Sequence, residues 1–315
     1  MKLVTYKIKN RSKHQIGVVH KNTVSNLNDF FGNISLVDLI QIENYQDKIA
    51  AHILNENHLS HDFEHLEILP TIPNPNSFRD AYAFRQHVET SRKNRGLEMI
   101  PEFDEFPVFY FSNPNSMYGD KAEIEVMPDH FEKLDYELEF AIVIGKNGKN
   151  ILAKDAEKYI GGFFILNDLS ARKLQMDEMK LNLGPSKGKD FANVIGPYLV
   201  TPDELESRSV ATSRGKKYDM TMRCYVNGEL LSTGNTKDMK WTFAEIIERV
   251  SYGVELFPGD IIGSGTVGTG CLLELNGTAK VKNSGFTECW IQENDEIIMS
   301  IDGLGKISNK IVKSK

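Results

Sequence analysis

The chain carries, from Leu134 to Ile144, the run LDYELEFAIVI. Its continuous apolar second half is typical of a β-strand that is buried on both faces. Because strand side chains alternate, Glu137 and Glu139 leave the same face, roughly 7 Å apart. An isolated Glu-x-Glu pair more often belongs to a solvated face, but Ala141 and Val143 continue this one. We therefore expect two buried carboxylates, which need a partner.

A second apolar stretch, from Gly162 to Leu166, runs directly into the residues NDLSARKLQ. It predicts a strand that ends close to Asp168, and Ser170 is expected to cap a following helix. On that helix Arg172 and Gln175 are three positions apart and therefore share one face. A helix cap alone would explain this pattern, but a further carboxylate at a strand end favours a functional site.

The carboxylates predict a site for a hard metal ion beside a general base. Oxygen ligands without thiolates suit Mg²⁺, Ca²⁺ or Mn²⁺ rather than zinc or copper. His87 lies seven residues after Asp80 and could act as the base. Taken alone, it would more often be an ordinary surface or core histidine. The expected metal ligands are Asp80, Glu137, Glu139 and Asp168.

These motifs resemble those of the fumarylacetoacetate hydrolase superfamily. They follow the family's order over roughly residues 75 to 300, with ELE at 137–139, NDLSAR at 167–172, GPSKGK at 184–189 and GDIIGSGT at 259–266. The segment DAYAFRQH, from Asp80 to His87, resembles the part of fumarylacetoacetase that supplies a metal-binding aspartate and a catalytic histidine. Glu274 matches the glutamate that orients this histidine.

The resemblance implies a fold, a reaction and further site residues. The fold is α+β and strand-dominated, a mixed β-roll with a small N-terminal domain, in a homodimer. The reaction is metal-dependent hydrolysis of a carbon–carbon bond in a 1,3-diketo acid, of the fumarylacetoacetate or acylpyruvate type, in the breakdown of tyrosine or other aromatic compounds. Arg172, Gln175 and Lys189 would stabilise developing negative charge, and Tyr82, Tyr110 and Thr266 would contact substrate.

One departure from the family pattern concerns substrate binding. Gly96 stands where fumarylacetoacetase has a substrate-contacting arginine. The duty of binding a substrate carboxylate would then pass to Arg85, Arg92, Arg95 or a nearby lysine.

Two other functions remain open. A lyase, isomerase or decarboxylase of the same superfamily, such as a 2-keto-4-pentenoate hydratase or an oxaloacetate decarboxylase, needs the metal and an enolate but not necessarily a dedicated water-activating dyad. A metal-binding β protein without catalytic activity would use the carboxylates only for stability. The pair His87 and Glu274 favours the hydrolase.

Composition is that of a soluble globular protein, with 40% hydrophobic and 26% charged residues. A net charge of -7 argues against nucleic-acid binding, which needs a basic face. The first twenty residues hold no continuous apolar segment, so we expect neither a signal peptide nor a membrane span. We therefore expect a cytoplasmic protein.

Cys224, Cys271 and Cys289 form no C-x-x-C pair and are expected to be reduced core residues rather than disulfides or a zinc site.

Prolines at 70, 73 and 75 mark a joint between two units. We expect a small α+β domain over residues 1–72 and the catalytic β-roll domain over residues 73–315. In the first unit, a strand is predicted at 15–19 and a helix at about 36–54. In the second, Asn147-Gly148 and Asn227-Gly228 predict tight turns, and Thr242 to Glu245 predicts a capping box.

Overall fold

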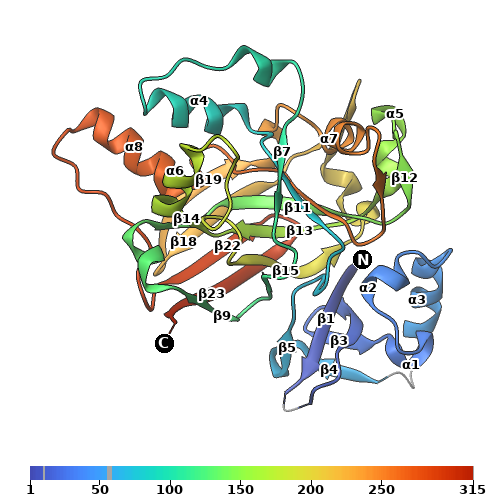
Figure 1. The fold of residues 1–315 in the computed structure, drawn as a ribbon. Helices are drawn as coiled ribbons and strands as arrows, with labels where there is room; N and C mark the ends of the chain where they lie inside the picture. Colours follow the sequence, from blue (N-terminus) through green and yellow to red (C-terminus); the bar gives the residue numbers. More distant parts are fainter. Residues whose placement is uncertain (10, 55–58, 315) are drawn as a thin grey trace.

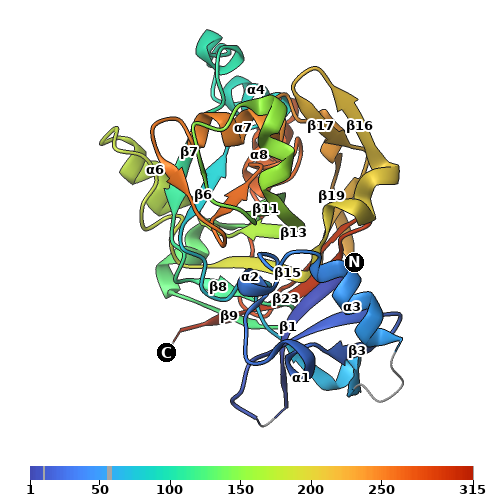
Figure 2. The same cartoon turned by 90° about the vertical axis from the view of Figure 1, so that its right-hand side faces the viewer.

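The structure is a computed structural model that describes residues 1–9, 11–54 and 59–314. Strands dominate it, and Figure 1 shows helices α4, α6, α7 and α8 above a body of strands, with the N-terminal segment in blue at the lower right. Figure 2 shows this segment packed below the same body from the side. Among the described residues, no helix has both the length and the apolar character that a membrane crossing requires.

The described strands are β1 (Lys2–Ile8), β2 (Gln15–His20), β3 (Thr23–Asn26), β4 (Ser60–Asp62), β5 (Leu66–Ile68), β6 (Phe78–Ala81), β7 (Phe109–Ser112), β8 (Met117–Tyr118), β9 (Glu123–Val126), β10 (Leu134–Asp135), β11 (Leu138–Ile144), β12 (Gly148–Lys149), β13 (Ile160–Asp168), β14 (Ser170–Ala171), β15 (Asn193–Val200), β16 (Ser209–Thr212), β17 (Gly215–Tyr218), β18 (Thr221–Val226), β19 (Glu229–Asn235), β20 (Glu255–Leu256), β21 (Ile261–Gly263), β22 (Glu296–Ile301) and β23 (Gly305–Lys313).

The α-helices are α1 (Asn28–Phe31), α2 (Leu36–Leu39), α3 (Tyr45–Ile53), α4 (Arg85–Lys93), α5 (Ala153–Ala156), α6 (Arg172–Met179), α7 (Phe243–Val250) and α8 (Leu272–Lys282). Short 3₁₀ helices are η1 (Phe63–His65), η2 (Pro101–Asp104), η3 (Pro128–Glu132), η4 (Glu157–Tyr159), η5 (Pro202–Arg208) and η6 (Thr236–Asp238).

Two mixed sheets organise the chain. The larger one follows the order β4-β3-β2-β1-β15-β13-β11-β21-β6-β7, with β5 beside β1 and β8 beside β15. The smaller one follows the order β19-β18-β22-β23-β9. Most neighbours are antiparallel, while β21 with β6, β15 with β8 and β23 with β9 are parallel. Non-consecutive strands are thus neighbours, which brings distant parts of the sequence together.

Strand β11 is buried along its whole length because both faces of the large sheet are covered. Its side chains Phe140 and Ile142 belong to the core that also contains Met222 and Met299 of the smaller sheet. On the opposite face, Ala141 and Val143 belong to a second core with residues of the N-terminal segment. These N-terminal members are Leu3, Ile16, Val18, Leu27, Leu36, Leu39, Ile40 and Ile49. The expectation of a strand buried on both faces is confirmed.

The N-terminal segment continues the large sheet. Strand β1 pairs antiparallel with β15, with Leu3 opposite Leu199. The expected joint lies between the end of β5 at Ile68 and the start of β6 at Phe78. Backbone pairing therefore links the residues on the two sides of this joint.

Several local expectations are confirmed. Strand β13 contains Gly162–Leu166 and ends at Asp168, and β2 covers the strand expected at 15–19. Asn227 and Gly228, both with positive φ, connect β18 and β19 as a two-residue hairpin loop. Thr242 and Glu245 form the predicted capping box at the start of α7.

Other expectations are wrong, each for a local reason. The strand from Leu134 to Ile144 is interrupted after Asp135, because β10 pairs with β14 whereas β11 pairs with β13 and β21. The expected helix at about 36–54 is divided into α2 and α3, with Asn44 in a left-handed conformation between them. Asn147-Gly148 closes no hairpin, because Gly148 pairs with β20.

Two side-chain expectations also fail. Ser170 does not cap α6: it lies in β14, and its hydroxyl donates to the carbonyl of Asp168. Cys289 is exposed, whereas Cys224 and Cys271 are buried as expected.

Candidate metal centre and catalytic site

Four buried carboxylates converge from neighbouring strands of the large sheet. Asp80 lies in β6, Glu139 in β11 and Asp168 at the end of β13, while Glu137 directly precedes β11. One oxygen from each of them lies within 4.8 Å of the others. The four predicted ligands are therefore brought together at one point, although they span 89 positions of the sequence from residue 80 to residue 168.

A glycine makes this convergence possible. Strand β21 lies between β11 and β6, with Gly263 paired to both Ala141 and Asp80. A Cβ atom on Gly263 would lie 2.2 Å from Oδ1 of Asp80, so the carboxylate fills the space that a side chain would take. Asp80 reaches Glu139 across β21 for this reason. The glycine was visible in the motif GDIIGSGT, but only the strand order explains it.

The cluster contains oxygen atoms without a protein partner. Asp168 and Glu139 are 0% exposed, and Asp80 is 2% exposed. Oε2 of Glu139 and Oδ1 of Asp168 are buried and accept no hydrogen bond from the described residues. Buried carboxylate oxygens are costly unless a cation or a donor compensates them.

Lys189 and Arg172 neutralise part of the cluster. Nζ of Lys189 bonds Glu137, Oδ2 of Asp168 at 2.6 Å and Oγ of Ser170 at 2.8 Å. Nη2 of Arg172 donates to Oε1 of Glu137 at 2.7 Å. Neither cation bonds Glu139 or Asp80, so the negative charge is compensated on only one side of the cluster.

The pKa values of the carboxylates report this imbalance. Although burial opposes the charge of Glu137, Arg172 and Lys189 hold its pKa well below the usual range. Burial, together with Asp168, raises the pKa of Asp80 to about 7. Burial and the neighbouring Asp80 raise the pKa of Glu139 well above its ordinary value. A cation placed near Glu139 and Asp80 would lower both values.

The residues fit a hard divalent cation. The cluster offers four carboxylates, an excess of negative charge and two buried oxygens without partners. Oxygen donors of this kind are preferred by Mg²⁺, Mn²⁺ and Ca²⁺.

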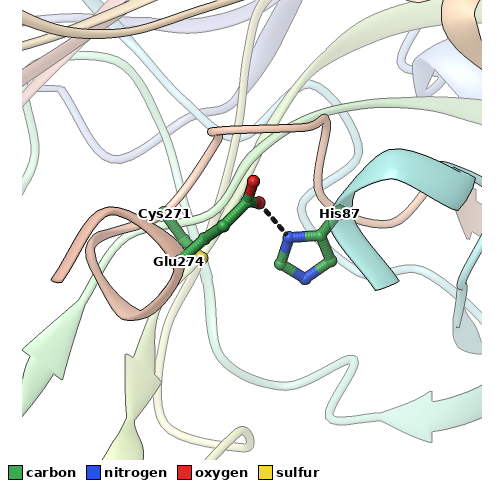
Figure 3. Close-up of side chains that lie close together, drawn as sticks. All are labelled: His87, Cys271 and Glu274. Atoms are coloured by element: carbon green, nitrogen blue, oxygen red, sulfur yellow. Dashed lines mark hydrogen bonds and ion pairs between the residues drawn. The ribbon is translucent and has the colours of Figure 1, made fainter. Parts of the chain in front are cut away.

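A histidine and a glutamate form a hydrogen-bonded pair close to the cluster. Nδ1 of His87, in α4, lies 2.7 Å from Oε2 of Glu274, in α8 (Figure 3). Both side chains are buried, and Nε2 of His87 has no partner among the described residues. Because a carboxylate accepts only, the neutral form of the imidazole carries its proton on Nδ1 and has a free lone pair on Nε2.

A cavity of about 380 Å³ joins the two groups. It is lined by Asp80 and Glu137 of the cluster and by His87 of the pair. The remaining predicted residues that line it are Tyr82, Tyr110, Arg172, Gln175, Lys189 and Thr266. The cavity therefore has a hydrogen-bond acceptor on one wall and carboxylates on another.

The residues predicted to contact substrate also support the site. The hydroxyl of Tyr110 donates to Oδ2 of Asp168, and that of Thr266 donates to Oε1 of Glu139 at 3.3 Å. The ring of Tyr82 packs edge-on against His87, with centroids 5.9 Å apart. Tyr110 and Thr266 thus hold predicted metal ligands as well as lining the cavity.

Asp135 is a site residue that the sequence reasoning missed. It is 0% exposed, and its Oδ2 accepts from Nε of Arg172 at 2.8 Å. Its two oxygens also accept from the backbone N–H groups of Leu272 and Leu273, at 2.7 and 3.0 Å, at the start of α8. One carboxylate therefore fixes both Arg172 and the helix that carries Glu274. The alternation Asp135, Glu137, Glu139 was a signal that could have revealed it.

Comparison with known proteins gives the relatives of the chain. The sequence model described as fumarylacetoacetate (FAA) hydrolase C-terminal matches residues 76–312. An uncharacterized protein of Staphylococcus epidermidis is 30% identical over 335 residues, covering 100% of this chain and 100% of the relative.

Solved structures share the fold over 100% of both chains. A fumarylacetoacetate hydrolase from psychrophilic Exiguobacterium antarcticum is 24% identical with a TM-score of 0.74. A maleylpyruvate hydrolase from Sphingobium sp. SYK-6, in complex with manganese(II) ion and pyruvate, is 18% identical with a TM-score of 0.74. A probable 2-hydroxyhepta-2,4-diene-1,7-dioate isomerase from Mycobacterium abscessus is 24% identical with a TM-score of 0.72. These identities show the fold alone, and this fold is shared by proteins named as hydrolases and by one named as a probable isomerase.

A divalent cation is expected to stabilise the folded protein. At one hundred times the dissociation constant, a ligand that binds only the folded state adds about 2.7 kcal/mol to the free energy of unfolding. Thermal melts with and without Mg²⁺ or Mn²⁺, after removal of metal with a chelator, measure this effect. Glu139→Gln should remove most of the shift, whereas Glu123→Gln, an exposed carboxylate in β9, should keep it. An equal shift in Glu139→Gln would contradict the metal centre.

Asp135→Asn is expected to destabilise the fold by about 3 kcal/mol or more, because it removes one partner of a buried ion pair and weakens the bonds to α8. Urea unfolding measures the change. The matched control is Asp302→Asn, which removes the partner of Arg223 in a half-exposed Asp–Arg pair and should cost less than about 1 kcal/mol. Similar decreases in the free energy of unfolding of the two variants would contradict the role of Asp135 in holding Arg172 and α8.

Proposed function

Because the chain belongs to the fumarylacetoacetate hydrolase family, we propose that its cavity hydrolyses a carbon–carbon bond in a 1,3-diketo acid with the help of a divalent cation. The observation that carries the proposal is one cavity lined by both His87 of the histidine–glutamate pair and carboxylates of the cluster. A water-activating base beside a cation site is what a hydrolytic reaction requires.

Asp80, Glu137, Glu139 and Asp168 would hold the cation, which we propose to be Mg²⁺, Ca²⁺ or Mn²⁺. When bound, it would polarise the attacked carbonyl and stabilise the enolate that leaves. The manganese(II) and pyruvate of the Sphingobium hydrolase structure support both the cation and the keto-acid class.

His87 acts as the general base in this proposal. Glu274 accepts a hydrogen bond from the Nδ1–H group and thereby holds the ring with Nε2 free. Nε2 takes a proton from a water molecule in the cavity, and the resulting hydroxide adds to the carbonyl carbon. Glu274 is a positioning residue, because it acts through the imidazole.

Gln175 is the best placed donor for the tetrahedral oxyanion. Its Oε1 accepts from Nη1 of Arg172 at 3.0 Å, which orients the amide, and its Nε2 has no partner among the described residues. Arg172 itself is engaged by Asp135 and Glu137, so it chiefly positions other groups. Lys189 faces the cluster and would protonate the carbon leaving group, which balances the proton that His87 removes from water.

Arg95 is the proposed partner for a second carboxylate of the substrate. Among the candidate arginines, Arg85 pairs with Glu89 and Asp104, and Arg92 donates to the carbonyl of Glu98. Arg95 lines the cavity, and its guanidinium forms one hydrogen bond within the described part of the chain, from Nε to the carbonyl of Ser91 at 3.0 Å. A dicarboxylic substrate such as fumarylacetoacetate or fumarylpyruvate would use the rest of the guanidinium.

His87→Gln is expected to lower kcat by about 10²-fold or more, because it removes the base. The metal-dependent thermal shift should persist, since His87 is not among the four ligands. Glu274→Gln should lower kcat less, because an amide oxygen can still accept from Nδ1. Steady-state kinetics with the best diketo acid measure both variants. Near-normal turnover of His87→Gln would contradict the dyad and favour a lyase or isomerase.

Arg95→Gln should lower kcat/KM for fumarylacetoacetate and fumarylpyruvate by about 10-fold, since a charge-assisted hydrogen bond contributes about 1.5 to 3 kcal/mol and this site is exposed. Acetylpyruvate, which lacks a second carboxylate, should be affected far less. Arg92→Gln, near the end of α4 and three positions before Arg95, is the control and should leave all three values near wild type.

Turnover of several substrates by the wild-type protein also tests the reaction class. The substrates should be fumarylacetoacetate, fumarylpyruvate, acetylpyruvate and oxaloacetate. Decarboxylation of oxaloacetate without cleavage of any diketo acid would contradict the hydrolase proposal and favour a decarboxylase. Binding of the cation without any turnover would favour a metal-binding protein.

A further inference from the structure

A cysteine completes a second group of possible metal ligands. Cys271, His87 and Glu274 each offer a ligand atom, and these atoms lie within 4.8 Å of one another. All three side chains are buried, and Figure 3 shows them close together. Nδ1 of His87 and Oε2 of Glu274 are already 2.7 Å apart. The sequence argued against zinc because it has no C-x-x-C pair, but the fold places Cys271 beside the histidine.

The donor atoms of this group differ from those of the carboxylate cluster. One thiolate, one imidazole and one carboxylate suit Zn²⁺, while four carboxylates suit harder cations. In tetrahedral zinc sites the ligand atoms are about 3.3 to 3.6 Å apart. The Nδ1 and Oε2 atoms would need to separate by about 0.6 Å to reach this spacing. Because His87 lines the cavity, water could supply the fourth ligand.

We propose that His87, Cys271 and Glu274 form a second metal site, which binds Zn²⁺ and switches the enzyme off. The zinc bonds Nδ1, so the ring proton moves to Nε2, and the nitrogen with the free lone pair becomes a donor. The thiol proton is released to solvent, and no oxidation or reduction takes place. The loss of activity rests on the proposed role of His87 as base, whereas the binding of zinc does not.

The binding test uses cobalt(II) as a spectroscopic substitute for zinc, on the full chain in saturating Mg²⁺ to fill the carboxylate cluster. We expect a thiolate-to-cobalt charge-transfer absorption that saturates at one ion per chain and disappears when zinc is added. Cys271→Ser should abolish the band, and serine at this N-cap position favours the start of α8. Cys289→Ser is the control, because it removes an exposed thiol elsewhere and should keep the band. No band, or a band that follows Cys289, would overturn the site.

The inhibition test measures turnover of the best diketo acid against zinc concentration, with each variant normalised to its own rate without zinc. Removal of even an indirect partner of a metal typically lowers affinity about 10- to 100-fold. Cys271→Ser and Cys271→Ala should therefore raise the inhibition constant at least about 10-fold, with Cys289→Ser unchanged. Equal inhibition of all variants would overturn the switch. If no substrate is turned over, the cobalt absorption still decides whether the site exists.

Discussion

The requirement to neutralise buried negative charge governs this structure. Asp80, Glu137, Glu139 and Asp168 lie in or next to β6, β11 and β13 of the large sheet and are at most 5% exposed, so water solvates them poorly. Isolated buried charges of this kind would unfold a domain or take up protons. Lys189 and Arg172 compensate the side that faces Glu137, whereas Asp80 and Glu139 form no ion pair with a cationic side chain of the described residues. The fold therefore buries more negative charge in the carboxylate cluster than its cationic side chains neutralise.

A second constraint connects the cluster to the histidine–glutamate pair. Arg172 joins Glu137 to Asp135, and Asp135 accepts from the first turn of α8. Glu274 lies in that turn, and its carboxylate holds His87. The carboxylate cluster and the histidine–glutamate pair are therefore connected through only two side chains, those of Arg172 and Asp135, so a displacement of one affects the other. This connection fixes the position of the proposed base relative to the proposed cation site on the other side of the cavity.

The sequence predicted the parts of this arrangement that repeat at short range. The period of two predicted that Glu137 and Glu139 lie together, although the strand is interrupted before Leu138, and an apolar run ending in Asp168 located the strand end, because it reflects local backbone geometry. Family resemblance added His87 with Glu274, which are 187 positions apart and share no local pattern. The role of Gly263 could not be predicted, since it depends on β21 lying between two other strands. The proximity of Cys271 to His87 could not be predicted either, because it depends on the arrangement of elements in space and not on a spacing in the sequence.

The interruption of the strand at Tyr136 and Glu137 explains how Asp135, Glu137 and Glu139, which lie within five residues, contact different parts of the structure. Asp135 lies in β10, which pairs with β14, and Glu139 lies in β11 within the large sheet. Between them, the backbone N–H of Glu137 donates to the side chain of Asn167 at 3.1 Å, which satisfies it without a strand partner. The three carboxylates therefore have different sets of partners: Asp135 accepts from Arg172 and the start of α8, Glu137 accepts from Arg172 and Lys189, and Glu139 accepts from Thr266. A regular strand would have placed all three carboxylates in one row on the same face, whereas the break lets Asp135 bond the start of α8 while Glu137 bonds Lys189.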